Sequence, residues 1–169
     1  IGGFKEFTTA DRIRKGKKII IHGDGKSLWT VTHSIDFARG FMGLVGNDQA
    51  IGHAFHITSD EILSWNTLYS ILAEALGREA NVVHISSDFI CQLEPSFTGT
   101  LLGDKAESVI FDNSKIKRFV PDFKATIPFR DGIKSTLAWL DKNPDQKIIS
   151  EDTNKKIDRI IAAYEKGLS

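Results

Sequence analysis

A glycine-rich turn, Gly23-Asp24-Gly25, follows the β-branched run at residues 17–22 and is the first candidate for phosphate chemistry. A dinucleotide site needs such a turn between a strand and a helix, because the N-terminus of the helix then faces the pyrophosphate. Here the turn leads into residues 27–32, which have the pattern of a second short strand. The pattern therefore favours a hairpin turn over a phosphate cradle.

Other side chains that could do chemistry are scattered along the chain. The histidines show neither HxH nor HExxH spacing, which disfavours a metal site, and no Gly-x-Ser-x-Gly segment offers a nucleophilic serine. They are His22, His33, His53, His56 and His84. The single cysteine, Cys91, excludes an internal disulfide and is expected to be a small buried apolar residue. The residues themselves predict neither a metal site nor a nucleophile triad.

The composition is that of one globular domain. Of the 169 residues, 41% are hydrophobic and 26% are charged, and 22 basic side chains balance 22 acidic ones. Because there is no basic surplus to attract a phosphate backbone, nucleic acid is not expected as a partner. No apolar run approaches the ~20 residues that span a bilayer, and the first residues lack the layout of a signal peptide. We expect a protein of the reducing cytoplasm.

The elements that must position these residues alternate irregularly between helix and strand. Periodicity near 3.6 with polar caps predicts helices at residues 8–16, 34–45, 64–76, 113–118, 129–141 and 151–166, and a short helix that begins at residues 86–88. Strands are predicted at 17–22, 27–32, 54–58, 81–85 and 108–111, and a loop at 94–103. The fold class is α/β, mixed α+β.

Six short motifs in this order resemble the C-terminal half of the NAD-dependent epimerases and dehydratases, which are extended short-chain dehydrogenase/reductases. The motifs are Gly23-Asp24-Gly25, Asp36-Phe37-Ala38, Phe55-His56-Ile57, Gly103-Asp104, Asp112-Asn113-Ser114-Lys115 and Gly132-Ile133…Trp139. The resemblance covers residues 10–143. It implies a substrate-binding domain at 1–143, a C-terminal helix at 144–169 packed on the same domain, and the absence of the Rossmann half.

The resemblance also implies a cofactor that this chain does not hold by itself. The family uses NAD or NADP and moves a proton with a Tyr-x-x-x-Lys pair. Tyr69 and Tyr164 are followed four residues later by Ala73 and Leu168 instead of lysine. We therefore expect NAD or NADP in the full-length protein, no cofactor in this fragment, no catalytic residue and no turnover by the fragment alone.

Aligning Asp36 with the family aspartate suggests which residues contact the substrate. Trp29 and Leu101 then stand where many nucleotide-sugar enzymes carry arginine, and neither can hold a diphosphate as an arginine fork does. The substrate-contacting set is Trp29, Thr30, His33, Leu101, Asp104 and Lys105. The hypothesis is a smaller or less anionic, sugar-like substrate, with Trp29 stacked on a ring face.

Each of these assignments has a structural alternative. Trp29 can be a core residue, His33 can cap a helix or form a buried hydrogen bond, and Asp104 and Lys105 can be a solvated loop pair. Asp36 is expected to be structural, because a carboxylate in the first turn of a helix stabilises the exposed amides there by ~0.3–1 kcal/mol.

The function has an alternative too, and the missing half has a physical consequence. Some members of the superfamily have lost catalysis and bind RNA or proteins, and the charge balance argues against RNA.

In the family, the strand at 54–58 joins the Rossmann sheet and the helix at 34–45 packs near it. Without that sheet an apolar surface is exposed, so we predict homo-oligomers through Phe37, Phe41, Phe55 and Ile57.

Overall fold

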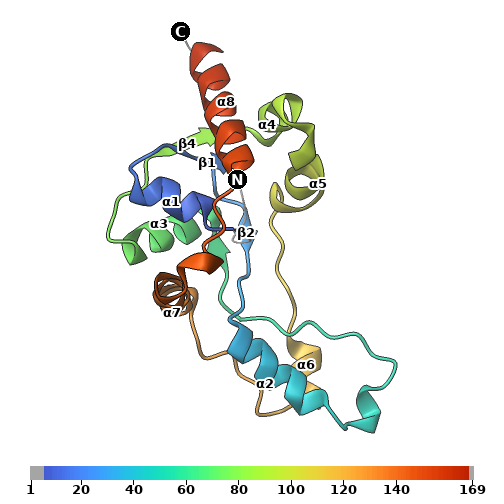
Figure 1. The fold of residues 1–169 in the computed structure, drawn as a ribbon. Coiled ribbons are helices and arrows are strands. Elements are labelled where there is room, and N and C mark those ends of the chain that lie inside the picture. Colours follow the sequence, from blue (N-terminus) through green and yellow to red (C-terminus); the bar gives the residue numbers. More distant parts are fainter. Residues whose placement is uncertain (1–5, 168–169) are drawn as a thin grey trace.

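Two short β pairs lie between helices in the computed structural model, which describes residues 6–167 (Figure 1). The helices are α1 (Thr8–Arg14), α2 (Ser34–Leu44), α3 (Trp65–Ala75), α4 (Ser87–Leu93), α5 (Thr98–Thr100), α6 (Ser114–Phe119), α7 (Phe129–Lys142) and α8 (Glu151–Gly167). The strands are β1 (Ile19–His22), β2 (Leu28–Trp29), β3 (Leu63–Ser64) and β4 (Val82–Ile85). The predicted mixed α/β class is confirmed.

The parallel pair β1·β4 is the centre of the molecule. Ile19 lies opposite Val82, and the register continues to His22 opposite Ile85. All four residues of β1 are buried, because helices cover both faces of the pair, as is usual for parallel strands. Alternate side chains of β1 enter two different apolar clusters, one with α1, α3 and α7 and one with α4 and α8.

The last helix, α8, packs on the second of these faces. Ile157, Ile160 and Ile161 are buried against Ile20 of β1 and neighbouring residues of β4 and α4. The guanidinium of Arg12, which is 1% exposed, connects α1 with α8. It donates hydrogen bonds to Asn154 Oδ1 (2.9 Å), Asp158 Oδ1 (2.5 Å) and the carbonyl of Lys18 (2.9 Å).

The predicted hairpin is wrong. β1 pairs with β4, and β2 pairs antiparallel with β3, so the turn Gly23-Asp24-Gly25 joins two different sheets. Gly25 has φ +71°, and its carbonyl accepts a hydrogen bond from Asn66 N of α3 (2.9 Å). A Cβ on Gly25 would lie 2.1 Å from Asn66 Oδ1. Gly25 is therefore explained by a close approach to α3, which the local sequence does not reveal, whereas Gly23 is explained by its φ of +58°.

Three other local predictions also fail. Residues 94–103, predicted as a loop, form helical turns at Pro95–Phe97, at α5 and in a π-turn at Leu101–Lys105. Residues 54–58 and 108–111 form no strand. Thr58 N donates to Asn113 Oδ1 (3.2 Å), and only Val109 N reaches a neighbouring strand, at the carbonyl of Leu28 (3.0 Å). Side chains thus replace the sheet partner that a strand requires.

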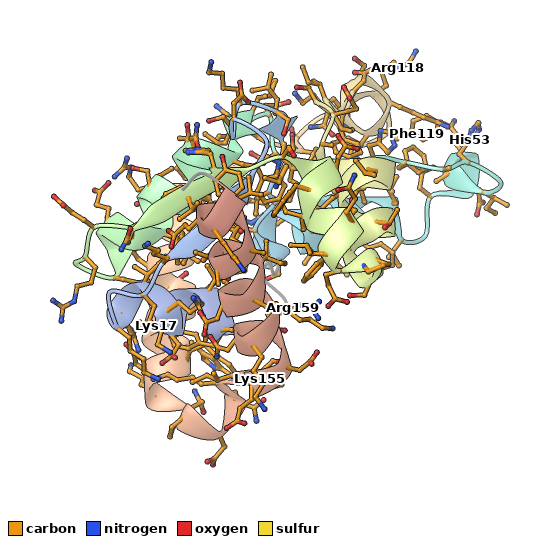
Figure 2. All side chains as sticks on the ribbon, turned by 90° about the horizontal axis from the view of Figure 1, so that it is seen from above. Lys17, His53, Arg118, Phe119, Lys155 and Arg159 are labelled. Carbon is orange, nitrogen blue, oxygen red and sulfur yellow. The ribbon has the colours of Figure 1, made fainter. Side chains whose placement is uncertain are left out.

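A separate lobe contains α2, α6 and the segment between α2 and β3, and it lies below the other helices in Figure 1. We call it the α2 lobe, residues 33–62 and 112–127. Its core has three buried apolar residues, Ile57, Ile116 and Phe123. At its tip, the rings of His53 and Phe119 have centroids 5.5 Å apart (Figure 2). No helix within residues 6–167 is long and apolar enough to cross a membrane.

Candidate functional site

Trp29 and Lys105 lie together although 76 residues separate them in the sequence. Strand β2 holds Trp29, and the π-turn holds Lys105 so that its Nζ lies 5.1 Å from the centroid of the indole ring. The carbonyl of Lys105 accepts hydrogen bonds from His22 Nε2 (2.9 Å) and from Ser27 Oγ (2.9 Å). Two side chains from the β1–β2 segment thus fix the backbone that presents the ammonium group.

Asp104 completes a pair of opposite charges beside the indole. Its Oδ2 lies 2.6 Å from Lys105 Nζ, and both side chains are partly exposed. The pair offers carboxylate acceptors and ammonium donors next to an aromatic surface, which is a suitable combination for the hydroxyls and the C–H face of a sugar. Because Asp104 already compensates the charge of Lys105, the arrangement provides little net attraction for a diphosphate.

Other aromatic rings surround Trp29. Its centroid lies 6.0 Å from that of Trp65 and 6.2 Å from that of Phe111, whose ring edge also contacts His56 (5.2 Å). Trp65 is 3% exposed, whereas Trp29 is half-buried. One face of the Trp29 indole is occupied by Lys105, so a sugar ring can stack there only after the lysine moves aside. The contacts of Trp29 with Trp65 and Phe111 therefore agree with the alternative that Trp29 is a core residue.

Burial controls the protonation of His22 at this site. Desolvation lowers the pKa of His22 below its ordinary value, and the nearby charge of Lys105 adds to that effect, while the hydrogen bond to the Lys105 carbonyl opposes it. The ring is therefore neutral at neutral pH, with its proton on the Nε2 that donates to the carbonyl. A neutral, buried His22 (4% exposed) acts as a strut between β1 and the π-turn.

His33 lies at the other end of the predicted set, where it caps α2. Its Nδ1 accepts a hydrogen bond from Ile35 N (3.2 Å), as the capping alternative predicts. The imidazole lies against α7, where a Cβ on Gly132 would be 2.8 Å from His33 Cδ2. A cavity of about 180 Å³ adjoins it between residues 31–34 and 127–136.

Leu101 differs from the other five predicted residues in its burial. Leu101 is 2% exposed and packs in the apolar cluster of α4 and α8, so its side chain offers no surface to a ligand here. Thr30 follows Trp29 and is half-buried. The structure thus brings Trp29, Asp104 and Lys105 together, places His33 at the start of α2 and buries Leu101 in the core.

Asp36 is fully buried and connects α2 with the segment before α7. Its Oδ2 accepts a hydrogen bond from Ile127 N (2.9 Å), and Arg39 Nη1 lies 3.2 Å from its Oδ1. Burial alone raises the pKa of Asp36, but the amides of Ile127 and Thr126 and the charge of Arg39 together hold that pKa below its ordinary value. The structural role predicted for Asp36 agrees with this environment.

Sequence reasoning missed three residues of the aromatic site: His56, Trp65 and Phe111. Trp65 lies in the helix predicted at residues 64–76 and is buried there, but nothing in the spacing links this helix to Trp29. The antiparallel pairing of Trp29 with Leu63 creates the link. Within residues 6–167, no cluster of His, Cys, Asp or Glu side chains is suited to a metal ion.

Known proteins share this arrangement of elements. No model of a known protein family matches the chain. It is 28% identical over 111 residues to the 2'-dehydrokanamycin reductase of Streptomyces kanamyceticus, and the match covers 64% of this chain and 31% of that protein. The UDP-glucuronic acid 4-epimerase of Bacillus cereus, solved with UDP-glucuronic acid and NAD, superposes with a TM-score of 0.63 at 20% identity over 80% of this chain and 38% of its own.

Two further solved structures agree. An epimerase of Methanothermobacter thermautotrophicus gives a TM-score of 0.64 at 22% identity, over 80% of this chain and 36% of its own. The dTDP-glucose 4,6-dehydratase of Bacillus anthracis, in complex with NAD, gives a TM-score of 0.62 at 16% identity, over 86% of this chain and 43% of its own. The chain has the fold of part of an NAD-dependent epimerase/dehydratase. This confirms the resemblance that the six motifs indicate. The chain spans 31–43% of the length of these relatives.

The glycine-rich turn after β1 does not lead into a helix. The only glycine-rich turn that follows a strand within residues 6–167 leads from β1 to β2, and β4 enters α4 through Ser86. No strand there runs through glycines into a helix, which is the geometry that a pyrophosphate needs.

Proposed function

We propose that this chain is the substrate-binding part of an NAD- or NADP-dependent oxidoreductase or epimerase that acts on a sugar-like molecule. The observation that carries the proposal is the group of Trp29, Asp104 and Lys105 within the fold of an epimerase/dehydratase fragment. Residues 1–143 form the substrate-binding domain and 144–169 its C-terminal helix. The cofactor and the proton-transferring tyrosine and lysine come from chain outside these 169 residues, and the fragment alone is inactive.

The residues of this chain bind and orient the substrate. Lys105 and Asp104 exchange hydrogen bonds with sugar hydroxyls, and Trp29 contacts an apolar ring face once Lys105 moves aside. His22 and Ser27 keep the π-turn in position during this movement, because they bind the Lys105 carbonyl and not its side chain. Thr30 and His33 extend the substrate-binding surface toward α2, and the buried Leu101 packs under the π-turn that carries Asp104 and Lys105.

The preferred substrate is not a common nucleotide-diphosphate sugar. The two positions that carry diphosphate-binding arginines in many relatives hold Trp29 and Leu101, and Leu101 is buried. The relative from Streptomyces kanamyceticus supports this direction, since its name specifies a dehydrokanamycin and not a nucleotide sugar. The solved relatives named for UDP- or dTDP-sugars share the fold at 16–20% identity, so they do not bear on the choice of ligand.

The exposed apolar face of α2 is the surface that meets the nucleotide-binding half. Ile35, Phe37, Phe41, Met42 and Val45 are all between 48% and 65% exposed. Three of them, Phe37, Phe41 and Val45, border a groove of about 550 Å³ together with Phe55 and Ile57. An apolar surface of this kind is stable in water only when another surface covers it. In the 169-residue chain alone, a second copy of the chain covers the α2 face and forms a homodimer. We place the full-length protein in the cytoplasm.

A second candidate function is a non-catalytic module that binds a protein. The same α2 face favours it, because an apolar surface with few charges suits a protein partner and not RNA. The two functions differ in one property: only the enzyme requires a dinucleotide in the full-length product.

The decisive experiment uses the full-length protein with Trp29→Ala and, as a matched control, Trp139→Phe. In protein that is still folded, we expect Trp29→Ala to raise KM for the sugar substrate about 3- to 10-fold, because stacking on an indole contributes about 0.5–1.5 kcal/mol. Trp139, which is 54% exposed on α7, should leave KM unchanged. An unaltered KM in a folded Trp29→Ala protein contradicts the site.

A dinucleotide titration separates the two functions. Full-length protein that binds NAD or NADP, beside a 169-residue chain that does not, supports the enzyme. A full-length product that is folded and binds neither dinucleotide supports the protein-binding module.

A further inference from the structure

A further cavity borders helix α3 beside Tyr69 and Leu72. It has a volume of about 260 Å³, roughly that of nine water molecules. Helices α1, α3 and α7 and residues 146–148 surround it, and apolar side chains such as Leu72, Ile133 and Leu137 form most of its walls. We call it the α1–α7 cavity. None of the six predicted substrate-contacting residues lines it.

Hydrogen bonds and ion pairs hold these walls in place. The segment after α7 is attached to the start of α1 by Phe7 N, which donates to the carbonyl of Ile148 (2.8 Å), and by Ser150 N, which donates to Thr8 Oγ1 (2.8 Å). Asp141 binds both Arg14 (3.0 Å) and Lys147 (2.6 Å) beside this segment. The cavity is therefore bounded by fixed elements and not by a loose surface loop.

One polar atom in the wall of the cavity lacks a partner. Glu6 lines the α1–α7 cavity, and its Oε1 is buried without a hydrogen-bond donor in the part of the chain that the structure describes. A carboxylate oxygen removed from water normally accepts a hydrogen bond, and leaving it unpaired is unfavourable. The two cations near Phe7, Arg14 and Lys147, already share Asp141.

We propose that the α1–α7 cavity binds a small apolar molecule that carries a protonated amine. The apolar walls receive the hydrocarbon body, and the ammonium group donates to Glu6 Oε1. A charged donor suits this position better than a neutral hydroxyl, because it supplies both the missing hydrogen bond and a compensating charge. This site is separate from the sugar site and does not depend on the function proposed for it.

Calorimetric titration of the 169-residue chain tests the proposal with three probes of similar shape: phenethylamine, phenethyl alcohol and phenylacetate. We expect the amine to bind at least about tenfold more tightly than the alcohol, because a hydrogen bond to a charged group is stronger than a neutral one. The Glu6→Gln variant should abolish that preference, and Glu79→Gln, at an exposed position, should retain it.

Equal affinity for amine and alcohol, tighter binding of phenylacetate, or no binding of any probe overturns the proposal. A variant with a filled cavity, Ile133→Phe, provides a second measurement that does not depend on Glu6. It should weaken the amine and the alcohol alike, and unchanged affinity for both places the probes elsewhere.

The stability of Glu6→Gln gives an independent readout without ligand. Removing the charge of a carboxylate that has one buried, unpaired oxygen should raise the midpoint of thermal unfolding of the free protein, while the same change weakens binding of the amine. A residue with a purely structural role gives the opposite result, a lower midpoint, and that outcome also overturns the proposal.

Discussion

The central region and the α2 lobe differ in how they bury apolar residues. Around β1·β4, two clusters gather residues from α1, α3, α4, α7 and α8, and many of these side chains are less than 2% exposed. The α2 lobe has a core of only three buried apolar residues, and the apolar stripe of its longest helix faces outward. The central region is complete by itself, whereas the lobe has the surface of a part that needs a partner.

The difference shows that one amphipathic pattern can have two outcomes. Helices α2 and α3 have the same length and similar apolar periodicity, yet α3 buries its stripe and α2 does not. Helix α3 packs on α7 and β1 within this chain. Helix α2 packs on its own lobe through Gly40, Gly43 and Leu44 and forms hydrogen bonds through Asp36 and Arg39, on the face away from its apolar stripe. Four predictions test whether this contrast is real.

The largest expected effect is a loss of stability from Leu68→Ala in α3. Leu68 is fully buried, so the truncation leaves a cavity and should lower the free energy of unfolding by about 2–5 kcal/mol. The matched change in the lobe, Met42→Ala, removes a side chain that is 65% exposed and should alter the free energy of unfolding by less than about 0.5 kcal/mol. Urea unfolding of both variants measures the contrast, and similar losses would refute it.

A smaller loss is expected for Gly40→Ala, where α2 approaches the core of its own lobe. The added Cβ would lie 2.5 Å from Ile57 Cγ2 and 2.9 Å from a ring carbon of Phe123. Overpacking of this kind should lower the free energy of unfolding by about 1–3 kcal/mol. Gly99→Ala, with no heavy atom within 4 Å of its Cβ, is the control and should be neutral or stabilising. A stable Gly40→Ala would mean that the lobe is loosely packed.

Asp36→Asn should show a loss that depends on pH. The variant keeps the shape of the side chain but loses the charge that accepts from Ile127 N, which should lower the free energy of unfolding by about 1–2 kcal/mol at neutral pH. Because folding lowers the pKa of Asp36, the wild-type advantage is full above about pH 4 and disappears as the pH falls through the folded-state pKa.

Urea unfolding across that pH range checks this expectation, as the difference between wild type and Asp36→Asn. Other carboxylates with lowered pKa values, such as Asp60 and Asp112, affect both proteins equally and cancel. A difference that does not change with pH would show that the carboxylate contributes through shape and not through charge.

The smallest effect on stability and the clearest effect on association are expected for Phe41→Glu. Phe41 is 52% exposed and stacks beside Phe37, so a charge there should disrupt the self-association of the chain without unfolding it. Sedimentation velocity at high concentration should show dimers for wild type and monomers for Phe41→Glu. Ile149→Glu, outside the lobe, should leave the dimer intact. A wild-type chain that is monomeric at high concentration would refute the predicted interface.

The local elements of the central region follow from the sequence because their signals are local. The run Ile19–His22, the polar cap Ser64 before Trp65 and the period of residues 151–166 each predict a strand or a helix where the structure has β1, α3 and α8. Errors occur where the outcome depends on a distant partner. The turn at Gly23–Gly25 has hairpin chemistry, but the residues that pair with β1 lie some 60 positions later.

The candidate site shows the same limit. Trp29, Asp104 and Lys105 could be chosen from motifs, and the structure does bring these three together. Trp65, Phe111 and His56 could not, because only the pairing of β2 with β3 and the path of residues 108–111 place them around Trp29. Leu101 was chosen by alignment, and its burial depends on how the π-turn packs against α8.

Local signals in the sequence predict the fold class, the positions of most helices and the resemblance to epimerases and dehydratases, because periodicity, caps and short motifs are properties of neighbouring residues. Three features become visible only in the folded chain: which strands pair, that Lys105 lies on Trp29, and that the apolar stripe of α2 remains uncovered while that of α3 is buried. Those outcomes require contacts between residues far apart in the chain, and the free energy of such contacts depends on the packing of the whole molecule.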